Sequence, residues 1–66
     1  MVYTQPVKVG DELNLEIINL GEKGDGVGKF KNFIILVPET NIGEVVKVVI
    51  KKVFDKFALA EICKED

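Results

Sequence analysis

The sequence predicts a small all-β fold, namely a closed or nearly closed barrel of five short strands. Three observations favour it: apolar and polar residues alternate along several segments, turn residues recur at short intervals, and β-branched side chains dominate the second half. A chain of 66 residues has room for one domain. Closure of the sheet would also remove the exposed edges through which small sheet proteins aggregate.

The first expected strand covers residues 12–19. In it, Leu13, Leu15 and Ile17 alternate with polar side chains, which is the period of a strand with one buried face. A glycine-rich loop at residues 21–26 follows, where the chain needs positive φ angles or a close approach of backbones.

The second and third strands are expected at residues 27–30 and 33–37. Lys31 and Asn32 between them form a tight turn, because Asn tolerates the left-handed conformation. The continuous apolar run at 33–37 predicts a strand that is buried on both faces. Pro38 ends it, since proline cannot donate to the ladder.

The last two strands are expected at residues 44–53 and 57–62, with a turn at 54–56. On the fourth strand one face carries Val46, Val48 and Ile50, and the other carries Val45, Lys47, Val49, Lys51 and Val53. Val46, Ile50, Val53 and Phe57 also fit the spacing of a helix. The abundance of Val and Ile favours the strand, because β-branched side chains fit a pleated surface better.

Composition argues against an enzyme. The chain has no His and no Arg, so the commonest general base is absent, and the single Cys63 has no partner for a disulfide.

The longest apolar run is far shorter than the roughly 20 residues of a membrane-spanning helix, and the first residues do not resemble a secretion signal. We therefore expect a cytoplasmic monomer with no cofactor, no metal, no small-molecule substrate and no membrane association.

The glycine-rich loop does not match the phosphate-binding motifs. A Walker loop requires Gly at position 23 and Ser or Thr at position 30, where this chain has Lys and Phe. The dinucleotide pattern fails as well, since Gly24, Gly26 and Gly28 are each two residues apart. A turn between two strands is the better interpretation of these glycines.

Charge is unevenly distributed along the chain. The net charge is −2, yet residues 23–56 carry seven Lys against four acidic residues, and both flanks are acidic. This pattern fits either an ordinary solvated surface or a local cationic face on an otherwise anionic molecule. A face that has Lys and no Arg can follow a phosphate backbone but is poorly equipped to read bases.

Basic residues are interleaved with aromatic ones in two segments, 29–33 and 51–57, as single-strand binders require. Ammonium groups neutralise phosphates, and exposed rings stack on unpaired bases. Phe30 and Phe57 are assigned to the core, whereas Phe33 and Phe54 are the best candidates for exposed rings, because each lies at a strand end beside a turn that contains Lys. Phe33→Ala is therefore expected to lower RNA affinity more than stability. The candidate RNA-binding residues are Lys23, Lys29, Lys31, Phe33, Lys52, Phe54 and Lys56.

Five fragments in order make the chain resemble a TRAM domain over residues 6–62. They are Pro6-Val7 with Gly10-Asp11, Gly24-Asp25-Gly26-Val27-Gly28-Lys29, Phe33-Ile34-Ile35-Leu36-Val37-Pro38, Gly43-Glu44-Val45-Val46-Lys47-Val48, and Phe57-Ala58-Leu59-Ala60-Glu61. The resemblance implies a five-stranded OB-like barrel that binds RNA. The family occurs as an appended domain of RNA-modifying enzymes and as small archaeal RNA chaperones that resemble cold-shock proteins, and residues 1–66 look like the second form.

Two departures from the family pattern concern the binding surface. The loop at residues 39–42 lacks the small residues and second proline that members often have, and the chain lacks their Arg and positive net charge. The leading hypothesis is a non-catalytic RNA chaperone of low specificity. The alternative is a protein-interaction module in a ribosomal or RNA-processing assembly, which the acidic balance would suit and which predicts a contiguous apolar patch.

Overall fold

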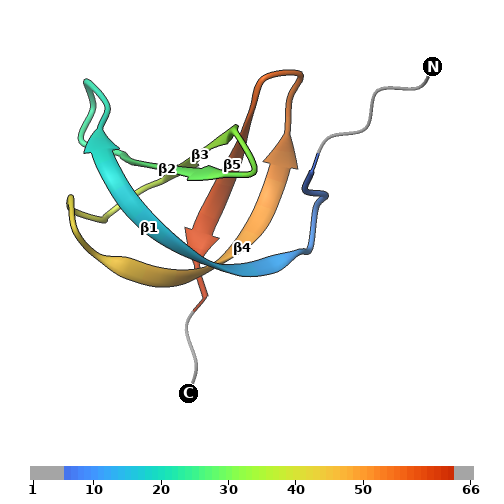
Figure 1. Cartoon of the computed structure of the whole chain (residues 1–66), viewed down its shortest axis with the longest axis horizontal. Coiled ribbons are helices and arrows are strands. Elements are labelled where there is room, and N and C mark those ends of the chain that lie inside the picture. The colour runs from blue at the N-terminus through green and yellow to red at the C-terminus, as the bar shows by residue number, and fades with distance from the viewer. Residues whose placement is uncertain (1–5, 64–66) are drawn as a thin grey trace.

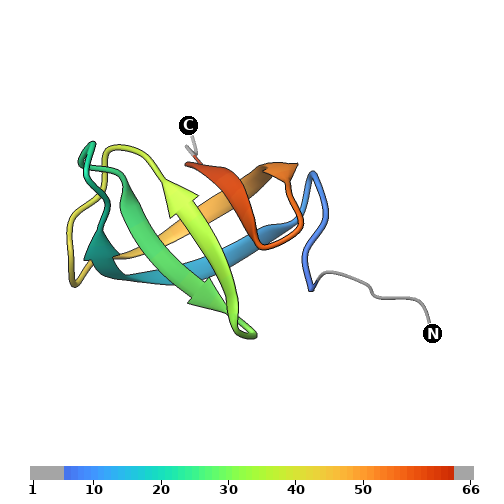
Figure 2. The same cartoon turned by 90° about the horizontal axis from the view of Figure 1, so that it is seen from above.

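The chain folds into a closed β-barrel of five strands, as the sequence predicts, in a computed structural model that describes residues 6–63. The strands are β1 (Glu12–Leu20), β2 (Gly26–Phe30), β3 (Phe33–Val37), β4 (Val45–Val53) and β5 (Phe57–Ile62). Their order around the barrel is β1-β2-β3-β5-β4, and β4 closes it by pairing with β1 (Figure 1). Viewed from above, β2, β3 and β5 form one wall in front of β1 and β4 (Figure 2).

Alternation of buried and exposed side chains confirms the strand assignments. Leu15 and Ile17 of β1 point into the barrel, as do Val48 and Ile50 of β4. The strand interpretation of residues 45–53 is therefore confirmed over the helical one. The bounds differ from the expected ones by a single residue where β1 ends, where β2 begins and where β4 begins. Residues 6–63 contain no helix long and apolar enough to cross a membrane.

The expectation that residues 33–37 are buried on both faces is wrong. Phe33, Ile35 and Val37 are buried, whereas Ile34 and Leu36 between them are only half-buried. An apolar run indicates burial on both faces when helices cover both sides of a sheet. In this barrel the inner face forms the core, and the outer face of β3 is open to solvent.

A β-bulge in β4 changes which side chains face outward. The pairing of β4 with β5 is regular up to Ile50 opposite Ala60, and it resumes with Lys52 opposite Leu59. The bulge inserts one extra residue, Lys51, so Val53 turns inward and packs against the core. The sequence alternation had placed Val53 on the outer face, and that expectation is wrong.

Two tight connections fix how β2 pairs with β3 and how β4 pairs with β5. Lys31 and Asn32 have φ angles of 52° and 67°, which confirms a two-residue turn and sets Phe30 opposite Phe33. At the β4–β5 turn, the Phe54 amide donates to the Phe57 carbonyl over 2.8 Å.

Glycine at position 28 allows β2 to approach β1 closely. A Cβ atom there would lie 2.6 Å from side-chain atoms of Leu15 and 2.9 Å from the Glu16 carbonyl oxygen. Such distances are shorter than carbon atoms tolerate, so a side chain at position 28 would push the two strands apart. Gly28 is thus required by the packing of β2 against β1 and not by a turn.

Candidate nucleic-acid interface

The outward-facing side chains of β2, β3, β5 and the end of β4 form one continuous surface, which we call the outer wall. Ile34 of β3 lies opposite Lys29 on one side and Phe57 on the other. One step along, Leu36 lies opposite Val27 and Leu59, and Lys52 follows Leu59 on β4. The outer wall therefore carries an apolar centre with lysines on both sides.

The parallel pairing of β3 with β5 brings two lysine-bearing turns to the same end of the barrel. Both strands begin at that end, because Ile34 near the start of β3 pairs with Phe57 at the start of β5. Lys31 belongs to the turn that precedes β3, and Lys56 belongs to the turn that precedes β5. The first residues of β3 and β5, more than twenty residues apart in sequence, are thereby placed about one strand spacing, roughly 5 Å, from one another.

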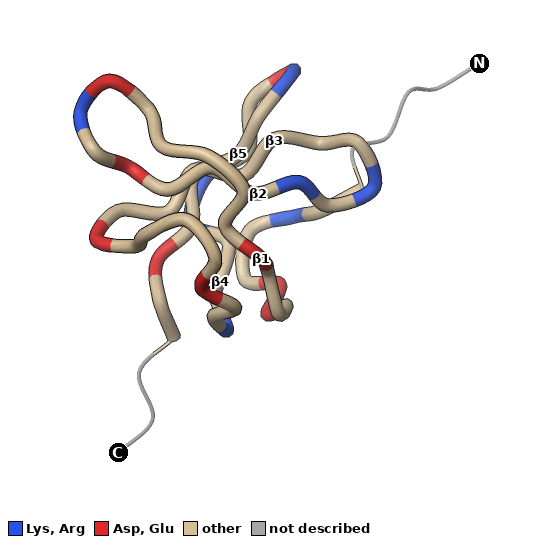
Figure 3. Tube along the Cα trace, turned by 60° about the vertical axis from the view of Figure 1, so that its left-hand side comes forward, with Lys and Arg blue, Asp and Glu red and all other residues tan. Residues whose placement is uncertain are grey.

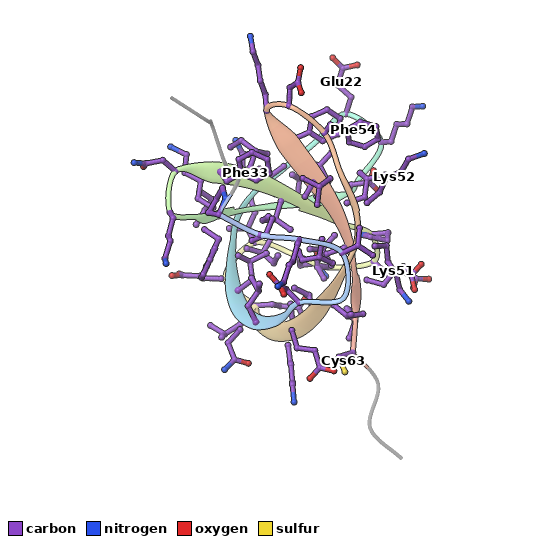
Figure 4. The ribbon with its side chains drawn as sticks, turned by 90° about the vertical axis from the view of Figure 1, so that its right-hand side faces the viewer. Glu22, Phe33, Lys51, Lys52, Phe54 and Cys63 are labelled. Atoms are coloured by element: carbon purple, nitrogen blue, oxygen red, sulfur yellow. The ribbon has the colours of Figure 1, made fainter. Side chains whose placement is uncertain are left out.

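Two aromatic rings stack at the β4–β5 turn. The ring centroids of Phe54 and Phe57 are 4.6 Å apart and the ring planes differ by 21°. The Lys52 ammonium lies 5.5 Å from the centroid of Phe54. Figure 4 places Phe54, Lys52 and Lys51 along the same side of the molecule. A half-buried aromatic pair beside an ammonium group is the combination that stacks an unpaired base and holds its phosphate.

A second cation–aromatic contact marks the other side of the outer wall. The Lys31 ammonium lies 5.5 Å from the ring centroid of Phe30. Phe30 is half-buried and packs against the core, in agreement with its assignment, while Lys29 and Lys31 are exposed. Lysines therefore stand at both sides of the wall, with the apolar residues of β3 and β5 between them.

Phe33 was expected to be an exposed stacking residue, and this expectation is wrong. Its exposed fraction is 4%, and it belongs to the core with Ile35 and Val37. The sequence held a signal that settles the direction of this ring. A two-residue turn at Lys31-Asn32 pairs Lys29 with Ile34, so Ile34 shares the outer face with the lysine and Phe33 must face inward.

Phe57 is the aromatic residue that the sequence reasoning assigned to the core and that the structure places on the outer wall. It is half-buried, stacks on Phe54 and is not among the residues of the core cluster. Lys51 was not among the candidate residues, although the alternation placed it on the outer face, and the bulge in β4 turns Lys52 outward beside it. Nothing in the sequence pattern marks that bulge.

Lys23 lies apart from the other candidate lysines. It sits in the β1–β2 loop with Glu22 and Asp25, whereas Lys31 follows β2 at its opposite end. Figure 3 shows this separation: the loop that carries Lys23 and the β2–β3 turn lie on opposite sides of the molecule. The expectation that Lys23 acts from the same side as Lys29 and Lys31 is therefore wrong.

No ion pair is recorded for a lysine of the outer wall in the part of the chain that the structure describes. Within residues 6–63 the recorded ion pair joins Lys47 to Glu12 over 3.5 Å, on the opposite wall formed by β1 and β4. The same part of the chain has no group of three or more residues suited to hold a metal ion. The lysines and aromatic rings of the outer wall can supply electrostatic attraction and ring stacking.

Comparison with known proteins places this chain in a family. The model of the TRAM domain matches residues 6–63, and the chain belongs to the TRAM domain family. An uncharacterized protein of Methanocaldococcus jannaschii is 45% identical over 56 residues, which cover 85% of this chain and 73% of the relative. A conserved protein of Methanococcus maripaludis, solved in solution, superposes with a TM-score of 0.86 at 34% identity, covering 92% of this chain and 87% of the other.

Longer relatives contain the domain as one part. Translation initiation factor 2 subunit beta of Methanothrix thermoacetophila is 41% identical over 62 residues, which are 94% of this chain and 30% of the relative. Ribosomal RNA large subunit methyltransferase E of Haloarcula marismortui is 41% identical over 58 residues, covering 88% of this chain and 22% of the enzyme. This chain matches only the domain, so it corresponds to a minor part of each of these proteins.

Proposed function

We propose that this TRAM domain binds single-stranded RNA without catalysing a reaction, and that it acts as an RNA chaperone. The observation that carries the proposal is the register of β3 with β5, which brings Lys31 and Lys56 to one end of a wall that also holds Phe54 and Phe57. The occurrence of the domain in a ribosomal RNA methyltransferase and a translation initiation factor supports an RNA ligand.

The mechanism requires no fuel. Lys29 and Lys31 hold phosphates on one side of the wall, Lys52 and Lys56 hold them on the other, and an unpaired base stacks on the Phe54–Phe57 pair. The stacking contact requires an exposed base face, so the protein binds a duplex more weakly than a single strand. Preferential affinity for the open form then shifts a misfolded RNA toward its single-stranded state.

The salt dependence of binding tests this mechanism. For single strands the slope of log K against log salt is about −0.7 for each neutralised phosphate, so four lysines predict a slope near −3. Fluorescence anisotropy with a labelled, unstructured RNA at several salt concentrations measures it. A slope near zero, or no binding at low salt, would contradict the proposal.

A second candidate function is a protein-interaction module, and one observation favours it. Ile18, Ile42 and Val45 are 50%, 59% and 68% exposed. The Ile17 amide donates to the Glu44 carbonyl and the Gly43 amide donates to the Ile17 carbonyl, so the segments that carry these three side chains are held together. A partner bound there would leave the outer wall open. A protein partner would support this function if its capture survives nuclease treatment and is lost in the variant Val45→Asp.

A further inference from the structure

The outer wall contains a shallow depression beside Lys52, and apart from this lysine its lining takes no part in the proposed phosphate and stacking contacts. Its volume is about 360 Å³, at the lower end of the range for ligand pockets. Its lining combines apolar residues, two lysines and two carboxylates: Leu36, Pro38, Leu59, Ala60, Lys51, Lys52, Asp25 and Glu61.

Strand registers explain how these residues meet. Leu59 lies between Leu36 of β3 and Lys52 of β4 in neighbouring ladders. Glu61 is two residues further along β5 and therefore faces the same side. Asp25 directly precedes β2, whose first residue pairs with Val37 of β3. The bulge in β4 turns Lys52 outward beside Lys51, so two lysines stand on the β4 side.

The chemistry of the lining fits a flat ligand with an anionic part and a hydrogen-bond donor edge. Apolar side chains such as Leu36 and Leu59 can pack against the face of a planar ring. Lys51 and Lys52 attract a phosphate. Asp25 and Glu61, when ionised, are acceptors only, so they bind N–H groups and repel carbonyl oxygens and phosphates. An unpaired nucleobase whose edge presents N–H donors has all of these properties.

We propose that this depression is a subsite for an unpaired guanine, and this inference rests on the proposed RNA-binding function. Guanine presents its N1–H and its N2 amino group side by side, which matches the two oxygens of one carboxylate in a bidentate pair. Uracil flanks its single N–H with two carbonyl oxygens, and adenine and cytosine place a ring acceptor beside their amino group. A carboxylate repels those acceptors.

Lys52 connects the subsite with the stacking site. It lines the depression, and its ammonium lies 5.5 Å from the ring centroid of Phe54. Two neighbouring nucleotides can therefore share this lysine, one base stacked on the aromatic pair and the next in the depression. A chain without Arg lacks the cation that reads bases best, but carboxylates can also read a base by accepting its hydrogen bonds. A base preference is thereby added to the sequence-independent phosphate contacts of the lysines.

The test compares two labelled hexanucleotides of RNA, one all uridine and one with a single central guanosine, by anisotropy at equal salt. We expect the guanosine to raise affinity about fivefold. This is the low end of the discrimination that a bidentate pair gives, because the depression is shallow. Replacing guanosine by inosine, which lacks the N2 amino group, should remove most of this gain. Replacement by 7-deazaguanosine, which keeps the same donor edge, should preserve it.

Glu61→Gln and Asp25→Asn identify the acceptor. At least one of them should abolish the preference for guanosine while the all-uridine RNA still binds. Glu16→Gln is the matched control, since it removes the same charge from the opposite wall and should leave the preference intact. Equal affinity for the two RNAs, or a preference that persists in both variants, would overturn the inference alone. Failure of both RNAs to bind would overturn the proposed function and this inference with it.

Discussion

Ile34 of β3 lies directly opposite Phe57 of β5 in the one parallel ladder recorded for residues 6–63. This pair aligns the starts of two strands that follow different turns, and it places the β2–β3 and β4–β5 turns at the same end of the barrel. Lysines that are distant in the sequence thereby flank a common apolar surface. The anionic total of the chain does not prevent this, because the acidic residues of β1 lie on the other wall.

Phe54→Ala should weaken binding of unstructured RNA about five- to tenfold, which corresponds to the low end of the stacking energy per base. The low end is expected because the ring is already half-buried. Stability should change little, since Phe54 is not part of the core cluster. Phe54→Tyr keeps the stacking face and serves as the control. Equal affinity of the alanine variant and the parent protein, measured by anisotropy, would contradict the role of this ring.

Phe33→Ala should destabilise the fold by about 3–5 kcal/mol, because it opens a cavity in the core. The earlier expectation that this change lowers affinity more than stability no longer holds. Chemical denaturation followed by circular dichroism gives the free energy of unfolding. A loss below about 1 kcal/mol would mean that the ring is not buried as the structure has it.

Combined replacement of Lys31 and Lys56 by Gln should reduce the steepness of the salt dependence by about 1.4, which is two phosphate contacts at about 0.7 each. The effect should be the same for RNAs of different sequence. Lys47→Gln on the opposite wall should leave the slope unchanged. If the control altered the slope as much as the double variant, the phosphates would not be confined to the outer wall.

Gly28→Ala should destabilise the barrel by about 1–3 kcal/mol, because its methyl group would overlap Leu15 and the Glu16 carbonyl. Gly21→Ala is a suitable comparison, since a Cβ atom there would meet only the Asp25 carbonyl oxygen at 3.7 Å. The second change should be close to neutral. Denaturation of the two variants under identical conditions checks the difference.

Most of the fold could be predicted because its signals are local. The alternation around Leu15 and Ile17, the turn at Lys31-Asn32 and the stop at Pro38 each depend on a few neighbouring residues. The direction of Phe33 was missed because every residue of 33–37 is apolar, so alternation alone does not tell which of them face inward. The turn at Lys31-Asn32 places Ile34 opposite Lys29, which faces outward, so Phe33 must face inward.

The composition of the candidate site was less predictable, because it depends on contacts between distant segments. The parallel ladder brings the turns with Lys31 and Lys56 to the same end of the barrel, and a bulge without a sequence signature turns Lys52 outward beside Lys51. Lys23 fits the charge pattern of the middle segment, yet the length of β2 separates it from Lys31. A linear charge pattern cannot distinguish the two ends of a strand.

An NMR titration of the isotope-labelled protein with single-stranded uridine-rich RNA is the sharpest test of whether the outer wall binds RNA, since it reports on each amide. The largest shift changes are expected at residues 29–34 and 51–59, while the β1–β4 wall around Ile18 and Val45 should change little. Changes centred on that opposite wall, or no changes at low salt, would contradict it.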